Sequence, residues 1–236
     1  MNYIVVPDSN ILFAMILKDD PKHQCAREVI SKYKELIVII DRILAEMMQK
    51  INRVLNEAFA EIFSHINEGF KVEDVLSVID QLCIEKPRNE NFYKYIKRNF
   101  LGYSEITHNT IVRIIDDKRE KMEKNLRDII SINEHMSKKL IERIDMNDDE
   151  LRDFANKLEN IILKKISFFK KIKNEKDRAI LEDLCVYARF FPLHIKFLTF
   201  DEDFYKAFKR IEEDINKLIA PGRIEFEYVK KYIAPK

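Results

Sequence analysis

Residues 3–12 constrain this chain most, because an apolar run there ends in three consecutive polar side chains. Residues 3–6, Tyr-Ile-Val-Val, are apolar and largely β-branched, which is typical of a buried strand. A proline ends the run, and Asp8, Ser9 and Asn10 follow it. In an open α/β sheet, ligands bind outside the carboxyl ends of the strands, so Asp8 and Asn10 stand where a site would be built. Ser9 or Asn10 could equally cap a helix that begins near residue 11.

The composition favours a helix-rich protein with few tight turns. Hydrophobic residues make up 46% of the 236 residues and charged residues 35%, with only 3 Gly and 6 Pro. This argues against a sandwich or barrel, which needs many turns. The net charge of +1 gives no bulk attraction for nucleic acid, so any such footprint must be local.

The cysteines and the N-terminus indicate an intracellular protein. Cys25, Cys83 and Cys185 are odd in number and far apart, without the spacing of a zinc site. This usage suits reduced thiols. The N-terminus lacks the features of a signal peptide, and no apolar run approaches ~18 residues. We therefore expect a cytoplasmic protein without a membrane anchor.

A second apolar run, Leu-Ile-Val-Ile-Ile at residues 36–40, predicts a second buried strand. Helical spacing between residues 23 and 33 separates it from the first. Continuous apolar strands joined by helices indicate a parallel sheet that is covered on both faces. Asp41 is a candidate cap for the next helix, and Glu46 follows just over one turn later. Glu46 is either a site residue near the edge that carries Asp8 or a solvated surface glutamate.

The middle of the chain predicts helices only. Apolar periodicity of the helical kind recurs at residues 72–82, 92–100, 111–144 and 151–172. A connection this long is usually functional or disordered, but its own periodicity predicts a folded subdomain. We therefore expect an α/β domain from residues 1–57 and 174–236, interrupted by a mostly α-helical insertion subdomain at residues 58–173.

Basic residues interleave with aromatic residues at two places in the predicted insertion. Such interleaving is what a groove for single-stranded nucleic acid would use, with cations on phosphates and rings under bases. A solvated helix face over core aromatics explains the same pattern. The candidate RNA contacts are Lys94, Lys97, Arg98, Lys170 and Lys171.

The last segment returns to alternating helix and strand, with helices at 177–188 and 205–218 and strands at 195–199 and 224–229. At 100° per residue, Asp177 lies on the same stripe as Ile180 and Leu184, whereas Asp183 falls about 240° away. Asp177 is thus expected to face the sheet, near the carboxyl end of the strand that follows. Further acids come directly after Thr199 at that end, namely Asp201 and Asp203.

Several carboxylates at one sheet edge would repel one another unless a cation lay between them. An all-oxygen ligand set suits Mg²⁺ or Mn²⁺. Such ions activate water for attack on a phosphodiester and stabilise the leaving oxygen. The sequence therefore predicts metal-assisted hydrolysis of a phosphodiester.

The order of these motifs resembles the PIN-domain family of metal-dependent ribonucleases. The resemblance is carried by Asp8-Ser9-Asn10, Ala45-Glu46-Met47, Asp177 ahead of Ile180-Leu181, and the run from Leu198 to Phe204. It covers about residues 3–57 and 174–230. It implies a parallel sheet flanked by helices, an acidic pocket for one or two Mg²⁺ or Mn²⁺ ions, and endonuclease activity on single-stranded RNA.

The resemblance also implies roles for single residues. The expected catalytic and metal-binding acids are Asp8, Glu46, Asp177 and Asp201, with Asp203 as a further metal ligand and Asn10 and Thr199 as polar pocket residues. Compact members place the third acid closer to the Thr-x-Asp element. That spacing favours Asp183, 16 residues before Thr199, over Asp177, 22 residues before it.

The leading hypothesis is an endoribonuclease that cleaves single-stranded RNA with metal-activated water. The alternative is an inactive PIN-like scaffold that binds RNA or protein. A hydrolase of another phosphorylated substrate is the third hypothesis, since phosphatase folds also use an Asp after the first strand. It ranks last because those folds normally carry a second Asp two residues later, where this chain has Asn10. Besides RNA, the partners considered are a second copy of the chain and a protein inhibitor or RNA-processing partner.

Overall fold

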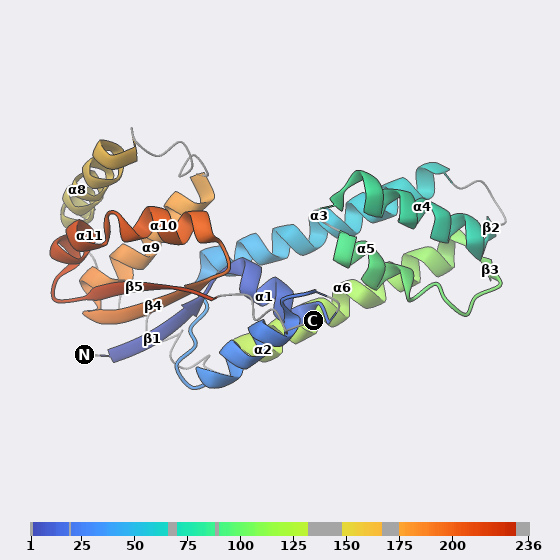
Figure 1. The fold of residues 1–236 in the computed structure, drawn as a ribbon, viewed down its shortest axis with the longest axis horizontal. Coiled ribbons are helices and arrows are strands. Elements are labelled where there is room, and N and C mark those ends of the chain that lie inside the picture. Colours follow the sequence, from blue (N-terminus) through green and yellow to red (C-terminus); the bar gives the residue numbers. More distant parts are fainter. Residues whose placement is uncertain are drawn as a thin grey trace, which may run out of the picture. The chain divides into compact units, whose positions relative to one another are not determined.

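The computed structural model describes residues 2–18, 20–65, 70–87, 90–131, 148–166 and 175–229. Its main sheet has three parallel strands in the order β1-β4-β5 (Figure 1). These strands are β1 (Asn2–Pro7), β4 (Leu193–Thr199) and β5 (Arg223–Tyr228). The predicted α/β class, with a parallel sheet flanked by helices, is confirmed.

The predicted second strand is only partly formed. Val5 makes one isolated parallel bridge to Ile37, with hydrogen bonds from Val5 N to Leu36 O (2.8 Å) and from Val38 N to Val5 O (2.9 Å). These bonds place this segment beside β1, on the side away from β4. Residues 37–40 are all buried, so the apolar run reflects burial correctly. A continuous ladder does not form because helix α3 (Asp41–His65) begins four residues after the bridge.

Three helices pack on one face of the sheet (Figure 1), namely α9 (Glu175–Phe190), α10 (Glu202–Lys209) and α11 (Glu212–Ile219). Phe208 of α10 stacks on Phe226 of β5, with ring centroids 3.8 Å apart. Phe204 meets Phe197 of β4 edge to face at 5.7 Å. The single helix predicted at residues 205–218 is thus two helices, and buried Ile211 occupies the break between them.

The opposite face of the same strands carries several polar side chains beside the buried Val5 and Leu198. Tyr3, His194, Lys196 and Glu225 share this face by the register of β1, β4 and β5. Lys196 Nζ donates a hydrogen bond to Glu227 Oε2 at 3.1 Å. Burial lowers the pKa of Lys196, but the hydrogen bond and charge of Glu227, together with Glu225, outweigh burial and raise it. Along β5, buried Ile224 and Phe226 thus alternate with the half-buried Glu225 and Glu227.

Contacts divide the chain into two compact units. The first, here called the sheet unit, consists of Met1–Ile11, Glu28–Leu44 and Ile130–Lys236. The second, here called the helical unit, consists of Leu12–Arg27 and Ala45–Ile129. Helix α8 (Asp148–Ile166) falls in the sheet unit, where it packs on α11. The predicted domain division at residues 58 and 173 stays a prediction.

The helical unit contains most of α1 (Ser9–Ile16) and α3, together with α4 (Val72–Glu85), α5 (Glu90–Lys97) and α6 (His108–Ser131). Helix α2 (His23–Lys32) crosses the boundary between Arg27 and Glu28. The helical unit also holds a two-residue antiparallel ladder of β2 (Phe70–Lys71) and β3 (Glu105–Ile106). Sequence periodicity did not predict this ladder, because two residues are too few to show a period. No helix in the described part of the chain is long and apolar enough to cross a membrane.

Candidate functional site

Asp8 lies at the carboxyl end of β1 and is nearly buried, with 6% of its surface exposed. Its backbone N–H donates to Leu198 O at 2.9 Å, which continues the pairing of β1 with β4. Its Oδ2 accepts hydrogen bonds from Asn10 Nδ2 at 2.6 Å and Thr199 Oγ1 at 2.7 Å. A buried carboxylate needs such donors, and two of them on one oxygen hold it in one orientation.

Thr199 connects Asp8 to Asp201. Its side chain is fully buried, and its Oγ1 accepts a hydrogen bond from the backbone N–H of Asp201 at 2.9 Å. Asp201 Oδ1 in turn accepts from Phe204 N at 2.9 Å and caps α10. A short hydrogen-bonded chain therefore joins Asp8, Thr199 and Asp201 across the carboxyl ends of two neighbouring strands.

Asn10 belongs to this arrangement as well. Helix α1 begins at Ser9, but the Asn10 side chain does not serve as the cap that its position suggested. Besides donating to Asp8, its Oδ1 accepts from Phe200 N at 3.3 Å. Asn10 thus links the start of α1 to the end of β4.

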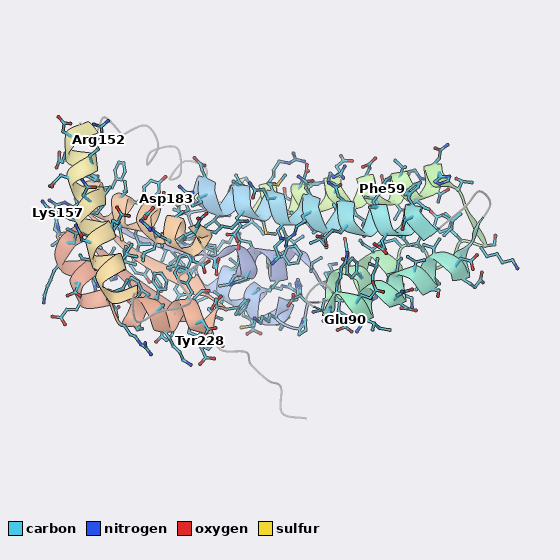
Figure 2. All side chains as sticks on the ribbon, turned by 90° about the horizontal axis from the view of Figure 1, so that it is seen from above. Phe59, Glu90, Arg152, Lys157, Asp183 and Tyr228 are labelled. Atoms are coloured by element: carbon cyan, nitrogen blue, oxygen red, sulfur yellow. The ribbon has the colours of Figure 1, made fainter. Side chains whose placement is uncertain are left out.

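The two candidates for the third acid lie on α9. Ile180, Leu181 and Leu184 are buried, as the predicted stripe requires. Asp177 stands in the first turn of α9 and is half-buried. Asp183, labelled on α9 in Figure 2, is also half-buried and forms a forked ion pair with Arg42. In this pair Arg42 Nε lies 2.5 Å from Asp183 Oδ2, and Arg42 Nη2 lies 3.3 Å from Asp183 Oδ1.

The remaining predicted acids are Glu46 and Asp203. Glu46 is half-buried on α3, in the helical unit. Asp203 is exposed in the first turn of α10, two residues after Asp201. Membership of both residues in the site stays a prediction.

The donor chemistry of this edge fits a hard divalent cation, because Asp8 and Asp201 offer carboxylate oxygens. Among the residues that the structure describes, however, no three His, Cys, Asp or Glu side chains form a group that could hold a metal ion. The structure thus provides two oriented carboxylates rather than a completed ligand shell.

The predicted RNA contacts fall into two sets. Lys94 pairs with Glu90 and Lys97 with Asp80, each at 2.5 Å, while Arg98 is exposed. Two of the neighbouring aromatic residues, Tyr93 and Phe100, are fully buried core residues, which favours a solvated helix face for this cluster. Lys170 and Lys171 lie outside the described residues.

Sequence reasoning missed Arg42 and Tyr187. Arg42 follows the predicted cap Asp41 directly, but its partner lies 141 residues away, so no local pattern marks it. Tyr187 is half-buried one turn beyond Asp183 on α9. Burial raises the pKa of Tyr187, and the charges of Asp41 and Asp183 raise it further.

The N-terminal half of the chain is similar to a known protein family. The family model of the PIN domain matches residues 5–116. Over these residues the chain is similar to the PIN-domain family. The predicted resemblance is thereby confirmed, and the match includes Asp8 and Glu46. It also extends through residues 58–116, which the predicted resemblance left outside.

No curated protein and no solved structure matched the chain. The PIN domain places the chain in a nuclease-like family. Asp8, within the matched residues, stands at the end of the first strand, and it shares a buried threonine hydroxyl with the backbone that leads into Asp201, which lies outside them.

Proposed function

We propose that this PIN-domain protein is a metal-dependent endoribonuclease that cleaves single-stranded RNA. The supporting observation is the buried carboxylate of Asp8, joined through Thr199 to Asp201 at the carboxyl ends of β1 and β4. A carboxylate that only filled space there would be replaced at lower cost by an apolar side chain. Its fixed orientation instead suits a residue that binds a ligand at the sheet edge.

The metal in this proposal is Mg²⁺ or Mn²⁺, with Asp8 and Asp201 as its ligands and Asp177 and Asp203, from the same unit, as further ligands. When bound, such an ion supplies an activated water and stabilises the leaving oxygen of the phosphodiester. Asn10 and Thr199 hold Asp8 in position. The cap on α10 engages Oδ1 of Asp201, which leaves Oδ2 for the ion.

The ion pair of Asp183 favours Asp177 as the third acid. Both oxygens of Asp183 already accept hydrogen bonds from the guanidinium of Arg42. A metal would have to compete with this fork for the same oxygens. Asp177 instead lies in the first turn of α9, six residues earlier.

The experiment that tests the proposal is cleavage of a labelled single-stranded RNA with Mn²⁺, with and without EDTA. Asp8→Asn should lower the cleavage rate by at least about 100-fold, because even outer-shell partners of a metal contribute 10- to 100-fold. Glu213→Gln, in an exposed ion pair of α11, is the matched control and should cleave normally. Cleavage that persists in EDTA or in Asp8→Asn would rule the proposal out.

An inactive RNA-binding scaffold is the second candidate. The described residues contain no complete metal-binding group, and one oxygen of Asp201 serves as a helix cap. If the wild-type protein binds single-stranded RNA in EDTA but never cleaves it with Mn²⁺, the scaffold is the better description.

A further inference from the structure

Arg42, the partner of Asp183, follows the sheet at the same edge as Asp8. The parallel bridge between Val5 and Ile37 aligns the two segments. Asp8 follows Val5 by three residues, and Arg42 follows Ile37 by five. The two segments run in the same direction, so Asp8 and Arg42 both come just past the carboxyl end of the sheet. Both belong to the sheet unit.

The guanidinium of Arg42 retains donors that this pair does not use. Asp183 engages Nε and one Nη2 proton, whereas a guanidinium carries five N–H donors in a fixed plane. The Arg42 side chain is 48% exposed and that of Asp183 is 30% exposed. The Nη1 edge is therefore still able to donate to a ligand in solvent while Asp183 holds the other edge.

The position of Arg42 in its helix does not suit a purely structural cation. Arg42 is the second residue of α3, and the first turn of a helix favours anions over cations because of the helix dipole. An exposed ion pair also contributes little to folding stability. A positive side chain in the first turn of a helix, next to its backbone N–H groups, is instead well suited to bind an anion that comes from outside.

We propose that Arg42 binds a backbone phosphate of the RNA and that Asp183 is a positioning residue that fixes the plane of its guanidinium. The inference rests on the proposed function, because it takes single-stranded RNA as the ligand. Arginine forks match phosphate oxygens in geometry, and a carboxylate behind the fork orients it. Asp183 then belongs to the phosphate contact and not to the metal.

RNA binding without metal tests this assignment separately from cleavage. The probe is a short fluorescein-labelled oligouridylate in EDTA, followed by anisotropy between about 50 and 200 mM salt. Arg42→Gln should weaken binding about tenfold, the effect of one charge-assisted hydrogen bond. It should also reduce the slope of log K against log salt by about 0.7, the value for one phosphate on a single strand.

Further variants separate positioning from charge and from metal binding. Arg42→Lys should restore the slope without the full affinity, because an ammonium keeps the charge but lacks the fork. Asp183→Asn should keep the wild-type slope of log K against log salt. It should also keep the wild-type affinity for Mn²⁺, measured by calorimetry. In a protein that already carries Arg42→Gln, Asp183→Asn should have no further effect on RNA binding. Lys217→Gln, in an exposed pair on α11, is the control for charge removal.

Several outcomes would overturn the inference. Wild-type affinity and slope in Arg42→Gln would do so, as would equal losses of melting temperature in Arg42→Gln and Asp183→Asn with unchanged RNA binding. Loss of Mn²⁺ binding in Asp183→Asn would make Asp183 a metal ligand. If the wild-type protein binds no single-stranded RNA, the proposed function fails together with the inference. If it binds and cleaves RNA while Arg42→Gln behaves normally, only the inference fails.

Discussion

A single hydroxyl group, Thr199 Oγ1, contacts both ends of the candidate site. It donates to Asp8 Oδ2 and accepts from the backbone N–H of Asp201. Because the side chain is fully buried, water cannot replace either bond without entering the core. The orientation of Asp8 therefore depends on this atom of the neighbouring strand together with the amide of Asn10.

Replacing this hydroxyl tests its role at the residue scale. Thr199→Val keeps the shape but leaves Asp8 and the Asp201 N–H each short of one partner, so we expect a loss of about 1–3 kcal/mol in unfolding free energy. The cleavage rate should fall about 10- to 100-fold, as for other residues that orient metal ligands. Thr199→Ser keeps the hydroxyl and should retain most of both. Denaturant titration and the RNA assay measure the two effects, and a valine variant as active as wild type would contradict them.

Among the elements, the parallel pair β4–β5 differs between its two faces. Ile195, Phe197, Ile224 and Phe226 meet the covering helices with apolar side chains. On the other face, Lys196 Nζ lies 3.1 Å from Glu227 and 3.9 Å from Glu225. The positive charge of Lys196 is thus paired with the negative charges of Glu225 and Glu227 on this face of the sheet.

Lys196 predicts a pH dependence of stability. Burial lowers its pKa, but Glu227 and Glu225 outweigh burial and raise it in the folded state. A raised pKa of this kind stabilises the fold below the unfolded pKa of about 10.4, and the benefit is lost as the pH rises through the folded pKa. Lys196→Gln should therefore lower the unfolding free energy by about 1 kcal/mol at neutral pH. The difference from wild type should shrink above about pH 10.4, as measured by urea titrations at several pH values. A difference that grows with pH would contradict this reasoning.

The elements also show where sequence patterns suffice. β1 was predicted because its apolar run is unbroken and a proline ends it, and Asp8 and Asp201 were found because each follows a strand end. Residues 36–40 were wrongly predicted as a full strand, since a run of apolar residues reports burial and not pairing. The pair between Arg42 and Asp183 lay beyond prediction, because a contact over 141 residues leaves no periodic trace.

At the scale of the whole molecule, the sheet unit is assembled from three separate segments of the chain, Met1–Ile11, Glu28–Leu44 and Ile130–Lys236. Periodicity predicted the helices within these segments but not which helices pack together. Helix α8 is an example: its sequence pattern matches that of the predicted insertion, yet it packs on α11. Segments that meet at the carboxyl edge bring acids from distant parts of the chain into one unit.

Acids gathered in this way should make the stability of the whole chain depend on divalent cations. Asp8 and Asp201 are connected through Thr199, and a cation that binds only the folded state stabilises it by mass action. At ten times the dissociation constant the gain is about 1.4 kcal/mol, which corresponds to a melting temperature about 3–6 °C higher for a chain of this size. We expect Mn²⁺ to raise the melting temperature of the wild-type protein and of Glu213→Gln, but not that of Asp8→Asn, in differential scanning calorimetry. An equal rise in Asp8→Asn would place the bound ion elsewhere, and no rise in the wild-type protein at millimolar Mn²⁺ would leave the two carboxylates without a metal to hold.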